Sequence, residues 1–179
     1  MNAIRADRPA IRPASVEDAA SIAEVHIRSW QWAYRGLLPD DFLDRLHETL
    51  DRRRELWTRI IGGEPGSQRT WVVEEADRIL GFASDGPSRD EDASPGTGEI
   101  GGIYLLPEAV GKGIGRDLFA RASDDLRALG FEEATLWVLE TNARARRFYE
   151  AAGWRPDGAT KVEERPRVIL DEVRYRARL

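Results

Sequence analysis

The segment from Gly98 to Leu129 constrains the fold of this chain more than any other. It opens with an apolar run that stops at Pro107, passes through a turn with three glycines and ends with apolar residues at every fourth position. The glycines are Gly111, Gly113 and Gly115, and the spaced apolar residues are Ile114, Leu118, Ala122 and Leu126. This order predicts a strand, a glycine-rich turn and an amphipathic helix. Because the first amides of a helix have no intrahelical acceptor and glycine lets a bulky anion approach them, the turn is suited to binding phosphate.

The composition predicts one globular domain over residues 1–179, with a loose polar tail at residues 1–9. Hydrophobic residues make up 41% and charged residues 33% of the chain, and no apolar stretch reaches the roughly 18 residues that a membrane span needs. The N-terminus lacks the apolar core of a secretory signal and the chain has no cysteine. We therefore expect a cytoplasmic protein without membrane contact, disulfides or thiolate metal sites. A net charge of -5 argues against nucleic acid as a partner.

Hydrophobic periodicity and turn residues predict further elements along the chain. Strands are expected at residues 10–13, 70–75, 78–84, 100–106, 135–139 and 173–179, and a mobile surface loop at residues 85–98. Helices are expected from Ser15 to before Gly36, in two short pieces between Pro39 and Gly62, from Ile114 to before Gly130 and from Asn142 to before Gly153. The last strand alternates apolar residues with Arg174, Arg176 and Arg178, which predicts one buried side and one solvated side.

Two common phosphate-binding signatures do not fit the glycine-rich turn. A P-loop requires Gly-Lys followed by Ser or Thr, but Gly113 follows Lys112 here. A dinucleotide-binding fingerprint requires a glycine three residues after its second glycine, and the two positions in question are Arg116 and Leu118. The turn therefore belongs to neither class of nucleotide-binding site.

A second motif follows further along the chain. Its residues are Asn142 at a predicted helix start, the pair Phe148 and Tyr149, and Gly153 with Trp154. The two motifs in this order, each after a predicted strand, resemble the GNAT superfamily of acyl-CoA-dependent N-acyltransferases. In that family the first motif is Gln/Arg-x-x-Gly-x-Gly/Ala, which corresponds to residues 110–115 and departs from the pattern at Val110. The resemblance implies an α/β fold with a mixed, mostly antiparallel sheet of six to seven strands and helices on both faces.

The resemblance also implies a binding site for acetyl-CoA. The turn would hold the pyrophosphate through backbone amides, and the strand at residues 103–106 would hydrogen-bond the pantetheine arm. The residues implied in cofactor binding are Ile103, Tyr104, Leu105, Val110, Gly111, Lys112, Gly113, Ile114, Gly115, Arg116, Asn142 and Phe148. In family members the strands that correspond to residues 100–106 and 135–139 splay apart, which leaves strand backbone free for the cofactor. Arg116 is expected to pair with a CoA phosphate.

The implied activity is transfer of an acetyl group from acetyl-CoA to a primary amine by direct attack in a ternary complex, without a metal. Tyr149 matches the tyrosine that protonates the CoA sulfur in many family members. Glu99 is a candidate base for the amine proton, against the alternative of a solvated strand-end carboxylate. Trp30 and Tyr34 lie at the end of the first predicted helix, beside the connection that borders the acceptor site in family members, although such aromatic residues are also common in cores. His26 and His47 are expected to serve packing or the surface.

The acceptor is expected to be a small-molecule or peptide amine, and two other functions stay open. The chain could be a non-catalytic acyl-CoA sensor or partner-binding module, or it could transfer a longer acyl group. A homodimer also stays open, since many members of the family dimerise.

Overall fold

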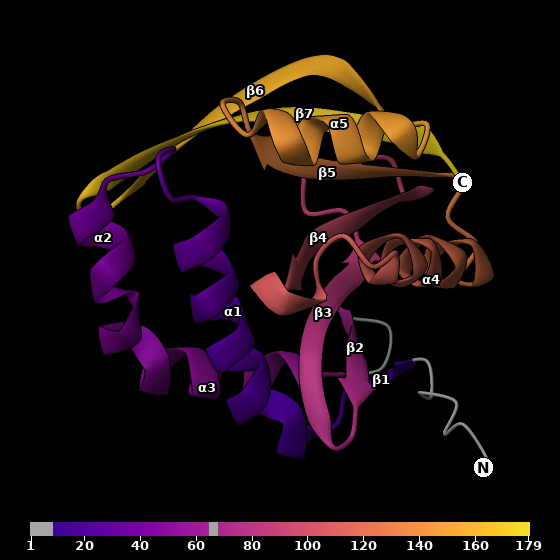
Figure 1. Cartoon of the computed structure of the whole chain (residues 1–179). Coiled ribbons are helices and arrows are strands. Elements are labelled where there is room, and N and C mark those ends of the chain that lie inside the picture. The colour runs from indigo at the N-terminus through magenta and orange to yellow at the C-terminus, as the bar shows by residue number, and fades with distance from the viewer. Residues whose placement is uncertain (1–8, 65–67) are drawn as a thin grey trace.

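The computed structural model describes residues 9–64 and 68–179, so residues 1–8 of the expected tail lie outside the described residues. The described chain forms a seven-stranded sheet in the order β1-β2-β3-β4-β5-β7-β6. The strands are β1 (Ala10–Pro13), β2 (Arg69–Glu75), β3 (Arg78–Pro87), β4 (Thr97–Leu105), β5 (Glu133–Leu139), β6 (Arg155–Arg165) and β7 (Val168–Arg178). Neighbouring strands are antiparallel except β4 and β5, which are parallel. The mixed, mostly antiparallel sheet is therefore confirmed (Figure 1).

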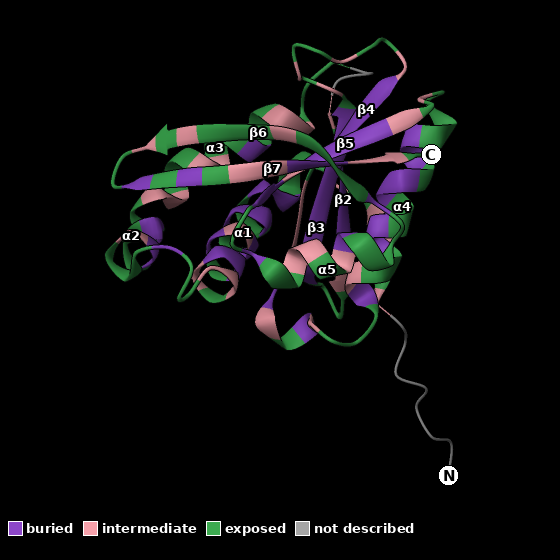
Figure 2. Ribbon diagram, turned by 90° about the horizontal axis from the view of Figure 1, so that it is seen from above, coloured by how far each residue is buried: buried purple, intermediate pink, exposed green. Residues whose placement is uncertain are grey.

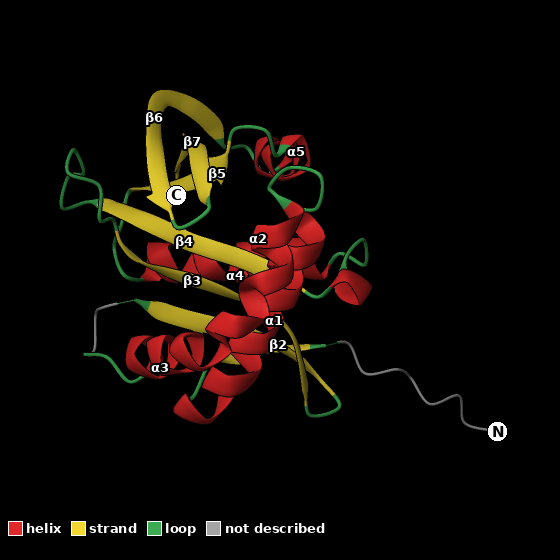
Figure 3. Ribbon diagram, turned by 90° about the vertical axis from the view of Figure 1, so that its left-hand side faces the viewer, coloured by secondary structure: helices red, strands yellow, loops and turns green. Residues whose placement is uncertain are grey.

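Helices cover both faces of this sheet. They are α1 (Ala19–Ala33), α2 (Asp40–Asp44), α3 (Leu50–Ile61), α4 (Ile114–Ala128) and α5 (Ala143–Ala151), with 3₁₀ turns at Val16–Asp18, Arg45–Thr49 and Pro107–Ala109. Helices α1 and α3 pack together over one face, and α4 and α5 lie on the other (Figure 1, Figure 3). Phe82 of β3 contacts Trp57 of α3, with 4.8 Å between ring centroids. On the opposite face, the guanidinium of Arg121 in α4 stacks 3.9 Å from the Trp71 ring.

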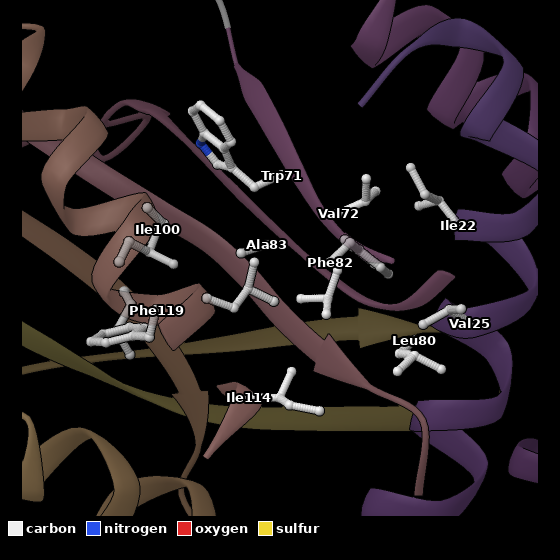
Figure 4. Packing of buried hydrophobic residues seen from close by; sticks show 14 of the residues in the cluster. Ile22, Val25, Trp71, Val72, Leu80, Phe82, Ala83, Ile100, Ile114 and Phe119 are labelled. Carbon is white, nitrogen blue, oxygen red and sulfur yellow. The ribbon is translucent and has the colours of Figure 1, made fainter. Parts of the chain in front are cut away.

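Strand β3 forms the centre of the hydrophobic core. All of its residues from Ile79 to Gly86 are buried, because helices cover it on both sides. Figure 4 shows Ile22 and Val25 of α1, and Phe119 of α4, directed toward this part of the sheet. Buried residues concentrate in the central strands, whereas β6 is largely exposed (Figure 2). Among the helices of the described ranges, none has the length and apolar composition that crossing a membrane requires.

The segment at residues 85–98 is shorter as a loop than expected. Residues 85–87 continue β3 and residues 97–98 begin β4, which leaves a loop of residues 88–96. Arg174 of β7 holds this loop through ion pairs with Asp90 at 3.1 Å and Asp92 at 2.6 Å. The prediction of a mobile loop was therefore wrong at both ends. Its Gly, Ser and Asp residues are local turn signals, but pairing with a neighbouring strand overrides them.

Strand β6 is missing from the expected elements. Its sequence contains proline, glycine and many charged residues, and most of its side chains are exposed, so it has no alternation of apolar and polar residues. It forms by pairing with β7, which begins at Val168 rather than at residue 173. Arg174 is buried rather than solvated as expected, because Asp90, Asp92 and Asp157 surround its guanidinium. Neutralisation by these three carboxylates makes its burial possible.

Two carboxyl groups meet in the core between β3 and α4. Asp85 is fully buried, accepts a hydrogen bond from Trp71 Nε1 at 2.9 Å and lies beside Asp125. Asp125 also accepts from Arg69 Nη1 at 2.8 Å. Burial, and then the neighbouring Asp125, raise the pKa of Asp85 to about 8. Asp85 Oδ1 and Asp125 Oδ2 are buried and have no hydrogen-bond partner among the described residues, so one proton held between the two carboxyl groups would satisfy both.

We expect Asp85→Asn to stabilise the protein increasingly as the pH rises. The unfolded chain loses the Asp85 proton near its ordinary pKa, whereas the folded chain keeps it until about pH 8. Deprotonation therefore favours the unfolded state between about pH 4 and pH 8, and the stability of the native protein falls over that window. The asparagine amide can donate to Asp125 without a proton equilibrium. The expected gain at pH 8 is roughly 1–3 kcal/mol in unfolding free energy.

Denaturant unfolding of both proteins at pH 5 and pH 8 measures this difference. Asp124→Asn, at a neighbouring and exposed carboxylate of α4, is the control and should leave the pH dependence as it is. If the Asp85→Asn and native curves stay parallel across this range, Asp85 does not hold a proton in the folded state.

Candidate functional site

Strands β4 and β5 lie side by side only where they begin. Their last register pair is Glu99 with Thr135, and beyond it the two strands diverge, as expected from the resemblance. A cleft of about 1940 Å³ opens along this divergence, between α4 and α5 on one side and α1 and α3 on the other. Residues 103–105 of β4 pair with β3 on one edge and have no partner strand on the edge toward β5. Backbone groups on this edge can therefore hydrogen-bond an extended ligand.

The turn between β4 and α4 forms an open cradle in the cleft. Gly111 and Gly113 have φ values of +80° and +84°, and a Cβ atom at either position would meet nothing within 4 Å. The amides of residues 111–115 have no backbone carbonyl acceptor in the described chain, whereas Val110 and Arg116 donate to Pro107 and Gly113. Unpaired amides at the start of a 15-residue helix attract an anion. The cradle thus has the shape and donors for a phosphate group.

Most residues predicted to bind a cofactor meet at this cleft. Those that line it are Ile103, Tyr104, Leu105, Val110, Gly111, Gly113, Gly115, Arg116, Asn142 and Phe148. The side chain of Lys112 is exposed outside the cleft lining, and that of Ile114 packs in the core. These two residues therefore face the cradle only through their backbone. Asn142 caps α5, because its side chain accepts a hydrogen bond from the Ala145 amide at 3.1 Å.

Tyr149 of α5 lines the cleft and is 9% exposed. Its ring packs among aromatic neighbours. The centroid distances are 5.5 Å to Phe119, 5.4 Å to Phe148 and 6.1 Å to Tyr175. Burial, with a smaller effect of nearby Tyr104, raises the pKa of Tyr149 above its ordinary value. The hydroxyl therefore stays protonated at neutral pH and can donate a proton in the cleft.

Glu99 is buried in the cleft wall and bound to Arg89, rather than solvated. Arg89 Nη2 donates to Glu99 Oε1 at 2.6 Å, and the Nε and backbone N–H of Arg89 donate to Oε2 at 3.0 Å and 3.1 Å. Both carboxylate oxygens therefore accept charge-assisted or backbone hydrogen bonds, with lone pairs left for one further partner.

Helix α1 supplies aromatic residues to the opposite wall of the cleft. The Trp30 ring is buried and lies 4.8 Å from the Tyr34 ring and 6.4 Å from the Tyr104 ring, as centroid distances. Burial raises the pKa of Tyr34 well above its ordinary value. Trp32 is 41% exposed, and the guanidinium of Arg144 stacks 4.3 Å from its ring. Trp30 and Tyr34, the predicted acceptor residues, thus both line the cleft.

Among the further cleft residues without a predicted role in the site are His26, Arg53 and Arg89. The His26 ring lies 4.8 Å from that of Tyr104 and accepts a hydrogen bond from Trp57 Nε1 at 3.3 Å. Burial, and then the charges of Arg53 and Arg165, lower the pKa of His26 well below its ordinary value, so the ring is neutral. A single histidine or arginine carries no local signal of such a position, whether it lies on a helix, as His26 and Arg53 do, or in a loop, as Arg89 does.

A central sheet that splays beside an anion cradle, with a buried tyrosine in the same cleft, defines the architecture of the GNAT acetyltransferases. A sequence model described as the acetyltransferase (GNAT) family matches residues 24–154. The chain therefore belongs to the GNAT acetyltransferase family, and it is an N-acetyltransferase.

Relatives of this chain are also named as N-acetyltransferases. It is 35% identical over 142 residues to the uncharacterized N-acetyltransferase YuaI of Bacillus subtilis (strain 168), covering 79% of this chain and 77% of YuaI. It is 24% identical over 159 residues to a spermidine N(1)-acetyltransferase of Thermoplasma acidophilum, covering 87% and 95% of the two chains.

Solved structures share the fold. The PaiA N-acetyltransferase of Thermoplasma acidophilum, crystallised in complex with coenzyme A, superposes with a TM-score of 0.72 at 21% identity, over 96% of this chain and 99% of that one. A GCN5-related N-acetyltransferase of Rhodopseudomonas palustris gives a TM-score of 0.76 at 19% identity, over 99% and 100% of the chains. Within the described ranges, no group of three or more His, Asp or Glu side chains is arranged to hold a metal ion.

Proposed function

We propose that this protein transfers an acetyl group from acetyl-CoA to a primary amine by direct attack in a ternary complex. The observation that supports this most is that the cradle, the unpaired edge of β4 and Tyr149 all open into one cleft. Acetyl-CoA carries its thioester on a long arm that contains amides and is joined to a diphosphate. It therefore needs an anion site, free strand backbone and the reaction centre along one path. The cleft continues beyond them into an acceptor half, defined here by His26, Trp30, Tyr34, Arg53 and Tyr104.

The residues present fit coenzyme A. The amides of residues 111–115 would hold the diphosphate, because a Cβ at Gly111 or Gly113 would enter the same open space. Arg116 lines the cleft and would add a positive charge beside it. The free edge of residues 103–105 would hydrogen-bond the pantetheine amides. When bound, acetyl-CoA supplies an activated thioester carbonyl for the amine to attack.

Tyr149 would act as the general acid. The phenol is protonated at neutral pH, so it can give its proton to the sulfur as the carbon–sulfur bond breaks. The chain has no cysteine to carry the acyl group, which favours direct attack by the amine over a covalent thioester intermediate on the protein.

Glu99 would receive the proton that the attacking amine loses. Its two oxygens already accept hydrogen bonds from Arg89, so we expect an intervening water to deliver the proton. Arg89 would then position the carboxylate rather than touch the reacting atoms.

A thiol-release assay with acetyl-CoA and a broad panel of amines tests the proposed function. The expected result is CoA thiol release that depends on an amine, with the N-acetylated product identified by mass spectrometry. Tight acetyl-CoA binding without release for any amine would instead support the non-catalytic sensor. Competition between acetyl-CoA, succinyl-CoA and longer acyl-CoAs decides the donor, and a preference for a longer chain would refute acetyl transfer.

A further inference from the structure

Arg53 carries a positive charge in the acceptor half without a carboxylate partner. It belongs to α3, which packs beside α1 (Figure 1). Its Nε donates to Thr49 Oγ1 at 3.0 Å, and its Nη1 lies 2.9 Å from His26 Nδ1. Its Cζ atom lies 5.7 Å from the Trp30 ring centroid. No Asp or Glu of the described chain forms an ion pair with Arg53, and its Nη2 group has no hydrogen-bond acceptor among the described residues.

The other charges of the cleft do not compensate Arg53. Ten basic and seven acidic side chains line the cleft, in a protein whose net charge is -5. The acids near the acceptor half already have partners. These ion pairs are Glu48 with Arg45 at 3.0 Å, Glu163 with Arg165 at 2.7 Å and Glu172 with Lys161 at 3.2 Å. The guanidinium of Arg53 is therefore one of the cleft charges without an ion pair, and burial lowers its pKa.

Aromatic rings surround this charge and connect it to the predicted reaction centre. His26 and Trp30 contact both Arg53 and Tyr104. Tyr104 is in turn close enough to Tyr149 to influence its titration. A ligand group bound at Arg53 would thus lie in an aromatic pocket of the same cleft that Tyr149 lines.

We propose that Arg53 binds a carboxylate of the acceptor, and that the acceptor is an amine that carries both a carboxylate and an apolar or aromatic body. This inference rests on the proposed acetyl transfer. A monoanion balances the unpaired charge of Arg53, and the free Nη2 group is a planar donor that suits a carboxylate oxygen. The surrounding rings of Trp30, Tyr34 and Tyr104 suit the apolar body.

Matched acceptors test this assignment. L-phenylalanine and phenethylamine share the amine and the ring and differ in the carboxylate. We expect the native enzyme to acetylate phenylalanine with a kcat/KM at least about 10-fold higher than that for phenethylamine, because only the carboxylate can form a charge-assisted hydrogen bond with Arg53. Arg53→Met should reduce the ratio to about 1 by raising KM for phenylalanine alone, and Arg53→Lys should restore part of it. Arg59→Met, at an exposed arginine of the same helix, is the control and should keep the native ratio.

Calorimetric titration of the CoA-loaded protein with both compounds gives a readout independent of turnover. Tighter binding of phenylalanine that Arg53→Met abolishes supports the proposal, even if neither compound is a good substrate. Turnover of amines with no preference for the carboxylate would refute it while the proposed acetyl transfer stands. A stronger preference for O-phosphoethanolamine would also refute it, in favour of a phosphate. Equal losses for both acceptors in Arg53→Met, with a lower melting temperature, would assign Arg53 a structural role.

Discussion

Replacing Gly113 with glutamate is expected to weaken acetyl-CoA binding by at least about 100-fold, or roughly 2.7 kcal/mol. Gly113 has a φ of +84° and precedes the first residue of α4, and no atom lies within 4 Å of where its Cβ would be. The new side chain therefore enters the open space of the cradle. Its negative charge opposes the diphosphate beside amides that would otherwise bind it. Isothermal titration calorimetry with acetyl-CoA measures the loss directly.

Gly130→Glu is the matched control for this variant. Gly130 follows the other end of α4, has a φ of +89° and also has open space around its Cβ position. Both substitutions impose the same backbone strain, of about 1–2 kcal/mol, and the same added charge. Only Gly113 lies in the cleft lining. Native affinity in Gly113→Glu, or an equal loss in Gly130→Glu, would show that the cradle is not the diphosphate site.

Removing the Tyr149 hydroxyl is expected to lower kcat about 100-fold while leaving the affinity for acetyl-CoA nearly unchanged. Tyr149→Phe keeps the ring contacts with Phe119, Phe148 and Tyr175, so the helix should stay in place. What it removes is the proton source for the departing sulfur. Steady-state kinetics with a saturating amine, together with calorimetry for acetyl-CoA, separate the chemical step from binding.

Tyr175→Phe serves as the comparison for this second variant. Tyr175 packs against Tyr149 and donates its hydroxyl proton to Glu150 at 2.7 Å, but it does not line the cleft. Its loss should reduce stability by about 1 kcal/mol and change kcat little. A kcat for Tyr149→Phe within twofold of the native value would exclude Tyr149 from the mechanism.

Local patterns predicted much of the fold. Some features depend only on residues close in sequence, so they could be predicted from the sequence. They are the apolar residues at every fourth position of α4, the glycines at its ends and the Asn142 cap of α5. Strand β6 could not, because its exposed and charged sequence becomes a strand only through its hydrogen bonds to β7. The same holds for the ends of the predicted loop at residues 85–98, which pair as strands despite their turn-forming residues.

The candidate site, like the fold, could be predicted from the sequence only in part. The sequence by itself determined the family, the glycine turn and the position of Tyr149, because these lie in short motifs whose spacing is set by helix and strand geometry. Only the tertiary structure decided that Arg89 binds Glu99, that Arg53 meets His26 without a carboxylate and that Asp85 is buried against Asp125. Such pairings depend on strand register and on the packing of helices across a sheet. Local periodicity contains no information about which charges those contacts bring together.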